Sequence, residues 1–311
     1  MEVQRYSPLK KADWNTFVEN SKNGTFMLNR DYMDYHSDRF TDHSLMFYDD
    51  NGKLKAVLPA SQHGNELRSH GGLTYGGIII DRNTTQQNVL EIFDILKGYM
   101  STNDIHNLIY KRVPNIYYSY PSDEDLYALF KNDASLIRRD ISTTIDFSNP
   151  ISFSERRRRN IKKSVKSRVV VHESMDFDKY IELLTEILKC RHNAVPVHSS
   201  KEIHLLRDRF PNNIKMIAAY LGNQMLAGSI LFITPKVVHT QYLMSTDEGR
   251  KVGGLDAVIN YVVELYKESH RYLDFGISTE SGGLYLNDGL ITQKQEFGGR
   301  AIAYDFYELK V

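Results

Sequence analysis

The sequence has very little cysteine and no long apolar run, and both absences narrow the class of protein. Cys190 is the one cysteine among 311 residues, so the chain forms no internal disulfide and no cysteine-ligated metal cluster. No run of roughly 18 apolar residues occurs, which excludes a membrane-spanning helix. The segment 1–20 has no apolar core of signal-peptide length. We therefore expect a cytoplasmic protein without a membrane span.

The chain also lacks an excess of either charge. It carries 39 basic and 39 acidic side chains, so the molecule as a whole has no electrostatic attraction for DNA. Any anion binding must come from local clusters. Hydrophobic residues make up 41% of the chain and charged residues 25%, which is the balance of a folded protein. At roughly 150 residues per domain, the length predicts two domains.

Two blocks of the sequence repeat one order of predicted elements: a hairpin, a strand, an amphipathic helix and a closing strand. Asn51-Gly52 and Gly222-Asn223 mark the two hairpin turns. The elements are hairpins at 45–60 and 216–232, strands at 67–80 and 237–245, helices at 85–99 and 254–269, and strands at 107–111 and 272–277. The repetition predicts duplication of one α/β unit, with domains at 1–149 and 150–311.

Several stretches in this order resemble the GNAT acyltransferase superfamily and, in the tandem form, the Fem aminoacyltransferases and their acetyltransferase relatives. They are Arg158–Ser164, Arg191–Phe210, Gly222–Ser229, Leu273–Gly276 and Gly289–Gly298. The resemblance implies a mixed α/β (α+β) fold of two tandem GNAT-like domains, each with a mixed central sheet flanked by helices. It also implies that the second domain binds the donor, acetyl-CoA or another acyl-CoA, between the strands 237–245 and 272–277.

A glycine-rich, basic segment at 249–255 joins a predicted strand to the long second helix. Acyl-CoA carries a pyrophosphate, which free backbone N–H groups at a helix N-terminus bind well. The segment resembles the GNAT pyrophosphate loop at Arg250 and Gly253 and departs from it at Leu255. The candidate donor-binding residues are Arg250, Lys251, Val252, Gly253, Gly254 and Leu255. A plain strand–helix connection is the alternative. The corresponding segment 81–85 lacks such glycines, so we expect the first domain to shape the acceptor site instead.

Acyl transfer to an amine needs alignment, donors for the developing oxyanion, and a base for the ammonium proton. No Ser/His/Asp or Cys/His motif appears, so a covalent acyl-enzyme is not expected. Four residues are candidates for the chemistry: a carboxylate in the closing strand, a carboxylate in the following glycine-rich loop, the lysine of the Fem-like terminal motif and a strand tyrosine. These are Asp274, Glu280, Lys294 and Tyr242. A purely structural role stays open for each.

Candidate substrate-binding residues come from both halves. Tyr75 lies in a glycine-rich strand, where missing side chains leave room for a ligand. His36 lies near helical spacing with Tyr32 and Tyr35, a pattern that also fits a packed helix. His198 is a candidate on the family resemblance alone, and His239 lies on the strand 237–245 before the glycine-rich segment. Arg159 and Lys162 belong to a run of eight basic residues between 156 and 168, which predicts a helix suited to phosphates or simply a solvated one. Two histidines, His192 and His198, do not make a zinc site, so no metal is expected.

Three functions remain open at this stage. The first is an acyl-CoA-dependent N-acyltransferase acting on a small-molecule amine or a sugar or cell-envelope precursor. The second is a Fem-like transferase of peptidoglycan precursors that takes an aminoacyl group from tRNA. The basic run and Lys294 support this function. The third is a non-catalytic binding module, which the departure at Leu255 favours.

Overall fold

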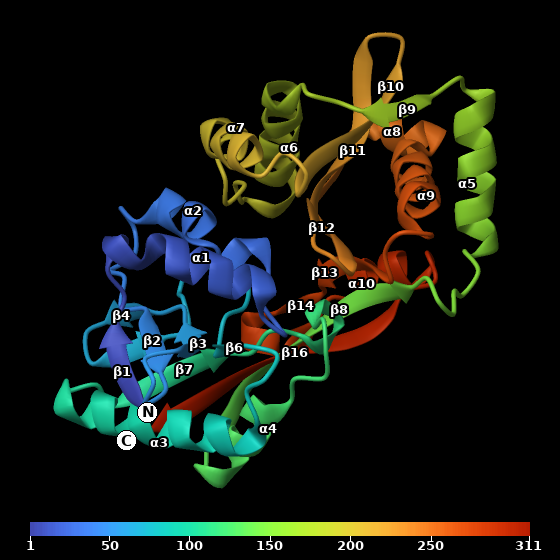
Figure 1. Ribbon diagram of the computed structural model, residues 1–311. Coiled ribbons are helices and arrows are strands. Elements are labelled where there is room, and N and C mark those ends of the chain that lie inside the picture. Colours follow the sequence, from blue (N-terminus) through green and yellow to red (C-terminus); the bar gives the residue numbers. More distant parts are fainter. The chain divides into compact units, whose positions relative to one another are not determined.

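The computed structural model describes residues 1–311, except the side chain of His192. The chain forms two compact units (Figure 1). The first unit comprises Met1–Asp140, Thr279–Tyr285 and Ala303–Val311, and the second comprises Ile141–Ser278 and Leu286–Ile302. Strands β8 (Ser135–Asp146) and β16 (Arg300–Lys310) therefore each contribute to both units. None of the described helices is both long and apolar enough to cross a lipid bilayer.

The first unit is built around the predicted hairpin and helix. Its strands are β1 (Glu2–Arg5), β2 (Leu45–Tyr48), β3 (Leu54–Leu58), β4 (Ser61–His63), β5 (Glu66–Arg68), β6 (Ile79–Ile80) and β7 (Asn107–Lys111). Its α-helices are α1 (Lys11–Asn20), α2 (Arg30–Met33), α3 (Gln86–Thr102) and α4 (Glu124–Lys131). Helix α3 buries Val89, Ile92, Phe93, Leu96 and Met100, which lie at helical spacing and form the centre of the core.

One predicted strand of the first unit is wrong over most of its length. The segment 67–80 forms a strand only at its two ends, in β5 and β6. Between them the chain leaves the sheet, with His70 at φ 51° and Gly77 at φ 78°. The Lys111 ammonium group donates to the carbonyl oxygens of Gly71 and Leu73, which holds this loop in place. The glycines thus mark a loop rather than a strand.

The second unit contains a mixed sheet with the strand order β8-β13-β12-β11-β10-β9. Its strands are β9 (Val170–Glu173), β10 (Ile214–Leu221), β11 (Gln224–Ile233), β12 (Val237–Ser245) and β13 (Tyr272–Ile277). Helices α6 (Phe177–His192) and α7 (Ser200–Arg209) lie on one face (Figure 1), and α9 (Gly254–Tyr266) packs on the other. Helices α5 (Glu155–Lys166), α8 (Asp247–Val252) and α10 (Asp288–Gln295) complete the unit.

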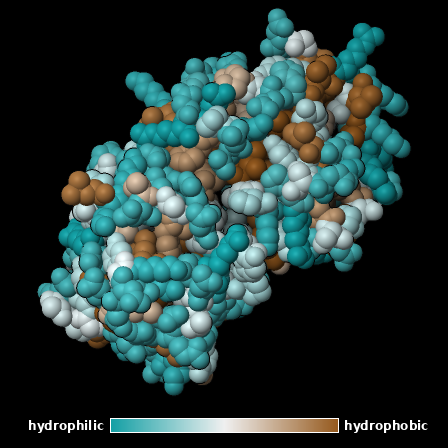
Figure 2. Space-filling view, viewed as in Figure 1, coloured by the Kyte–Doolittle hydropathy of each residue, from teal (hydrophilic) through white to brown (hydrophobic). Residues whose placement is uncertain are grey.

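The predicted duplication is visible in the order of elements. Hairpin β2–β3, strand β6, helix α3 and strand β7 occur in the same order as β10–β11, β12, α9 and β13. Strands β4 and β5 are added before β6 in the first unit, and helix α8 before α9 in the second. Helix α9 buries Val258, Ile259 and Val262 against the sheet at the predicted spacing. The molecular face in Figure 2 is mostly hydrophilic, with apolar side chains in separate patches, as expected when the apolar stripes face inward.

Candidate functional site

The most distinctive feature of the second unit is the place where β12 and β13 part. The two strands pair in parallel from Val237↔Tyr272 to His239↔Asp274, and the register stops there, although both strands continue. Each strand carries a bulge near this point: β12 has an extra residue at Gln241 opposite β11, and β13 has one between Asp274 and Ile277 opposite β8. Bulges bend a strand and end its pairing, so the two strands separate into a splay.

Gly276 and Lys294 maintain the bend in β13. Gly276 has φ 73°, a conformation that favours glycine. The Lys294 ammonium group of α10 donates to the carbonyl oxygens of Gly276 and Ile277, at 2.7 Å each. Successive carbonyls of a regular strand point in opposite directions, so one ammonium group reaches both only because the strand is distorted. Burial lowers the pKa of Lys294 to about 8, although the nearby Asp274 raises it.

A row of polar side chains crosses three strands at the start of the splay. His239 Nδ1 of β12 lies 2.8 Å from Oδ2 of Asp274 on β13. The other carboxylate oxygen of Asp274 accepts hydrogen bonds from Ser142 Oγ at 2.5 Å and Thr144 Oγ1 at 2.8 Å, both on β8. Asp274 is fully buried. The sequence did not single out Ser142 and Thr144, although their i, i+2 spacing in a strand places both on one face.

A cavity of about 480 Å³ lies beside the start of α9. Its walls come from α5, α6, β12, α8, α9 and α10, and they combine an apolar side with three arginines. The lining residues are Arg156, Arg157, Asn160, Leu184, Ile187, Leu188, Leu243, Met244, Ser245, Arg250, Leu255, Asp256, Leu290 and Gln293. Among the described residues, Arg250 has no ion-pair partner, whereas Arg156 and Arg157 bind Glu296. Arg250 is thus the cation here that a ligand anion reaches without displacing a carboxylate.

The segment before α9 is not the loop that the sequence predicted. Residues 247–252 form the short helix α8, which Thr246 caps, and the chain turns into α9 at Gly253 with φ 76°. A Cβ at Gly253 would lie 2.4 Å from the carbonyl oxygen of Asn160, so this glycine allows α5 to approach closely. Lys251 is exposed, Val252 is half-buried, and a Cβ at Gly254 would contact Ala227 at 3.3 Å.

The first turn of α9 is partly occupied by the protein's own side chains. Asp256 is buried there, and its Oδ1 accepts from Arg157 at 3.1 Å and from Asn160 at 3.3 Å. Gly253 occupies the N-cap position before α9 and provides no side-chain hydrogen bond to the helix. Sequence reasoning treated the basic run as mostly exposed and missed this contact. The sequence did contain a sign of this contact: Asp256 is an acidic residue in the first turn of α9, and the segment that forms α5 is rich in arginine.

The remaining predicted residues have other contacts and do not belong to this row. The Tyr242 hydroxyl is bonded to His198 Nδ1 at 2.7 Å. Glu280 lies in β14 (Thr279–Glu280) of the first unit and is exposed. Tyr75 is buried and its hydroxyl donates to Thr25 Oγ1 at 3.2 Å, while His36 is buried against His70. Arg159 and Lys162 are exposed on α5. His192 lies outside the residues whose side chains the structure describes.

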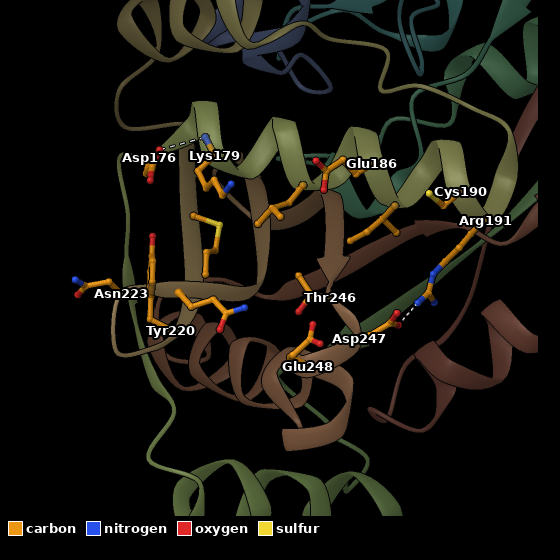
Figure 3. Close-up of a pocket in the computed structure, with 14 residues that line it drawn as sticks. Asp176, Lys179, Glu186, Cys190, Arg191, Tyr220, Asn223, Thr246, Asp247 and Glu248 are labelled. Atoms are coloured by element: carbon orange, nitrogen blue, oxygen red, sulfur yellow. Dashed lines mark hydrogen bonds and ion pairs between the residues drawn. The ribbon is translucent and has the colours of Figure 1, made fainter.

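A second cavity, of about 500 Å³, lies between α6, the β10–β11 turn and α8 (Figure 3). Figure 3 shows the Arg191 guanidinium pointing to Asp247, and this ion pair bounds one end of the cavity. Glu186 and Glu248 also line it, so its charge is mainly acidic. An acidic cavity does not suit a phosphorylated ligand. The cavity beside α9, lined by three arginines, suits an anion better.

The buried histidines of the first unit predict an acid-sensitive fold. Burial, with the nearby charges of His36 and Lys111, lowers the pKa of His70 from 6.5 to about 2. The unfolded chain therefore binds a proton below about pH 6.5 that the folded chain does not. Stability should fall by up to about 1.4 kcal/mol per pH unit below that pH from His70 alone. Asparagine tolerates positive φ, so His70→Asn keeps the backbone conformation. This variant should show a flatter slope of unfolding free energy against pH between pH 6.5 and 4.5. An unchanged slope in urea titrations would contradict this.

Comparisons with known proteins support the fold through solved structures, not through sequence. No protein-family model matches the sequence, and no curated protein matches it. FemX matches with a TM-score of 0.71 at 11% identity, over 100% of this chain and 98% of FemX. L-PGS from Bacillus licheniformis matches with 0.64 at 11% identity, over 99% and 93% of the two chains. A tandem GNAT protein from the clavulanic acid biosynthesis pathway matches with 0.54 at 11% identity, over 99% and 98%.

Proposed function

We propose that the second unit of this chain is an N-acyltransferase. The proposal starts from the tandem GNAT fold. The second unit moves an acyl group, acetyl in the simplest case, from acyl-CoA to the amine of a small molecule or of a sugar or cell-envelope precursor. The observation that carries this proposal is the splay of β12 and β13 in the unit that also holds the cationic cavity beside α9.

The splay suits an extended donor arm. Past His239, strand β12 pairs with β11 on one side and no longer with β13 on the other. The amide groups of a pantetheine arm add to such an edge as a further strand. At the far end of β12, Arg250 and the N-terminus of α9 provide positive charge for the pyrophosphate. Asp256 reduces that charge, and its ion pair with Arg157 offsets the reduction.

The first unit differs at the corresponding helix. Helix α3 begins with a capping box, in which the Thr85 side chain accepts from the Asn88 N–H and the Asn88 side chain accepts from the Thr85 N–H. Such a box satisfies N–H groups that a phosphate would otherwise bind. This supports a single donor site, in the second unit, and an acceptor-shaping role for the first.

Replacing Arg250 by Gln should weaken binding of acetyl-CoA roughly tenfold or more, because a charge-assisted bond to phosphate is lost. The measurement is calorimetric titration with acetyl-CoA, together with turnover on a panel of primary amines. The matched control is Lys267→Gln, which removes a charge just past the other end of α9. Absence of acetyl-CoA binding and of turnover in the folded wild-type protein would sink the proposed function.

A second candidate is an aminoacyl transferase that uses charged tRNA, and the outer face of α5 favours it. Arg159, Lys162, Lys163 and Lys166 lie three or four residues apart on one helical face, are exposed, and have no acidic partner among the described residues. Such a stripe binds a phosphodiester backbone. A gel shift with aminoacyl-tRNA that is lost when these four residues are changed to Gln, with no turnover of acetyl-CoA, would decide for this candidate.

A further inference from the structure

The row from β8 through β13 to β12 has the form of a base with a fixed orientation. Asp274 is fully buried, so it has no surface with which to touch a substrate. Its Oδ1 accepts two hydroxyl hydrogen bonds, from Ser142 and Thr144, and these stabilise the ionised carboxylate. The remaining oxygen, Oδ2, faces His239 Nδ1 at 2.8 Å.

This arrangement determines the tautomer of His239. An ionised carboxylate only accepts hydrogen bonds, so Nδ1 of the imidazole must carry the proton that it donates to Asp274. In the neutral ring, Nε2 is then the unprotonated nitrogen. Among the described residues, Nε2 has no hydrogen-bond partner. The ring therefore presents a free lone pair at the point where β12 and β13 part.

The imidazole edge is also accessible. The His239 side chain keeps 12% of its surface exposed, in contrast to Asp274. Gly276 lies next to the ring: a Cβ at this position would be 3.3 Å from Cε1 and 3.9 Å from Nε2 of His239. Any side chain larger than a methyl group would cover that edge, so glycine at 276 serves the open ring as well as the backbone bend.

From this geometry we infer that His239 is the general base of the transfer and that Asp274, Ser142 and Thr144 are its positioning residues. The inference rests on the proposed function and adds the substrate class, an aliphatic amine that arrives as an ammonium ion. His239 Nε2 takes one proton from R–NH₃⁺, and the freed amine attacks the thioester carbonyl. The C–N bond forms, the C–S bond breaks, and the thiolate takes the second amine proton to leave as thiol. The proton on His239 passes to water, which balances the reaction.

The tautomer is tested without any substrate. Long-range ¹H–¹⁵N correlation spectra of His239 at alkaline pH should show the proton on Nδ1. In Asp274→Asn the amide group is expected to donate to Nδ1, because its carbonyl oxygen takes over the two hydroxyl bonds, and the ring proton should move to Nε2. A wild-type ring with its proton on Nε2 overturns the inference.

The role in transfer is tested by pH profiles of kcat/KM with acetyl-CoA and a primary amine. His239→Gln and Asp274→Asn should each lower kcat/KM roughly 100-fold and change its dependence on pH, since a general base contributes about 10²–10⁴-fold. Both variants should bind acetyl-CoA as the wild type does. His172→Gln, an exposed histidine on β9, is the matched control. Turnover of His239→Gln within twofold of wild type, with an unchanged profile, overturns the inference and leaves the proposed function standing. A wild type without donor binding or turnover fails the proposed function itself.

Discussion

Replacing Lys294 by Met should abolish binding of acetyl-CoA to a folded protein. The ammonium group holds the carbonyl oxygens of Gly276 and Ile277, and without it β13 is free to relax toward regular pairing with β12. Closure of the splay would remove the free strand edge to which the donor arm binds. Any donor that still bound would be misplaced by an ångström or more, which costs roughly 100-fold in rate. Calorimetry with acetyl-CoA and the rate of amine acylation measure the effect.

The same substitution should change stability much less than it changes binding. The pKa of Lys294 is lowered from 10.5 to about 8, so keeping the buried ammonium group charged costs about 3 kcal/mol. Methionine carries no charge and removes this cost. Two buried carbonyls lose their partner, at about 1–3 kcal/mol each, so the two effects largely offset.

Lys111→Met is the control for Lys294→Met. Lys111 is likewise buried, with its pKa lowered to about 8 by burial, and likewise bonded to two carbonyls, but in the first unit. It should leave acetyl-CoA binding intact. Equal loss of binding in both variants would show that Lys294 acts through stability alone.

Gly253→Ala should destabilise the second unit more than Gly222→Ala does. Positive φ costs an alanine about 1–2 kcal/mol, and the new Cβ would lie 2.4 Å from the backbone oxygen of Asn160, which cannot rotate away. Helix α5 must move, at a further cost of about 1–3 kcal/mol. The unfolding free energy in urea measures the sum.

Gly222→Ala provides the matched control for Gly253→Ala. Gly222 has φ 57° and nothing within 4 Å of an added Cβ, so only the backbone term applies. The difference between the two variants isolates the contact of α5 with the start of α9. Equal effects would mean that this contact is loose, and the description of the cavity walls would then be wrong.

The sequence predicted the elements that depend on local pattern. The hairpins with turns at Asn51-Gly52 and Gly222-Asn223 and helix α9 are confirmed. The tandem GNAT fold is confirmed as well, because solved structures of that fold match nearly the whole chain. Turn residues and apolar spacing are local signals, so these elements can be predicted without knowledge of tertiary contacts.

The geometry of the candidate site depends on contacts between distant residues and was not predictable in this way. The bulges at Gln241 and Gly276 appear only when β11 and β8 supply the opposing register. The partnership of Arg157 with Asp256 joins helices about a hundred positions apart in the chain, so neither residue alone suggested it. Asp274 was considered for direct chemistry, whereas it is fully buried and His239 is the partly exposed member of the pair.

Hydrogen–deuterium exchange with and without acetyl-CoA tests the central claim most directly. If the donor lies between β12 and β13 with its phosphates at α9, protection should rise in segments 240–245, 250–257 and 275–277, and Lys294→Met should remove that change. Protection confined to the first unit, or to the acidic cavity beneath α6, would contradict the account.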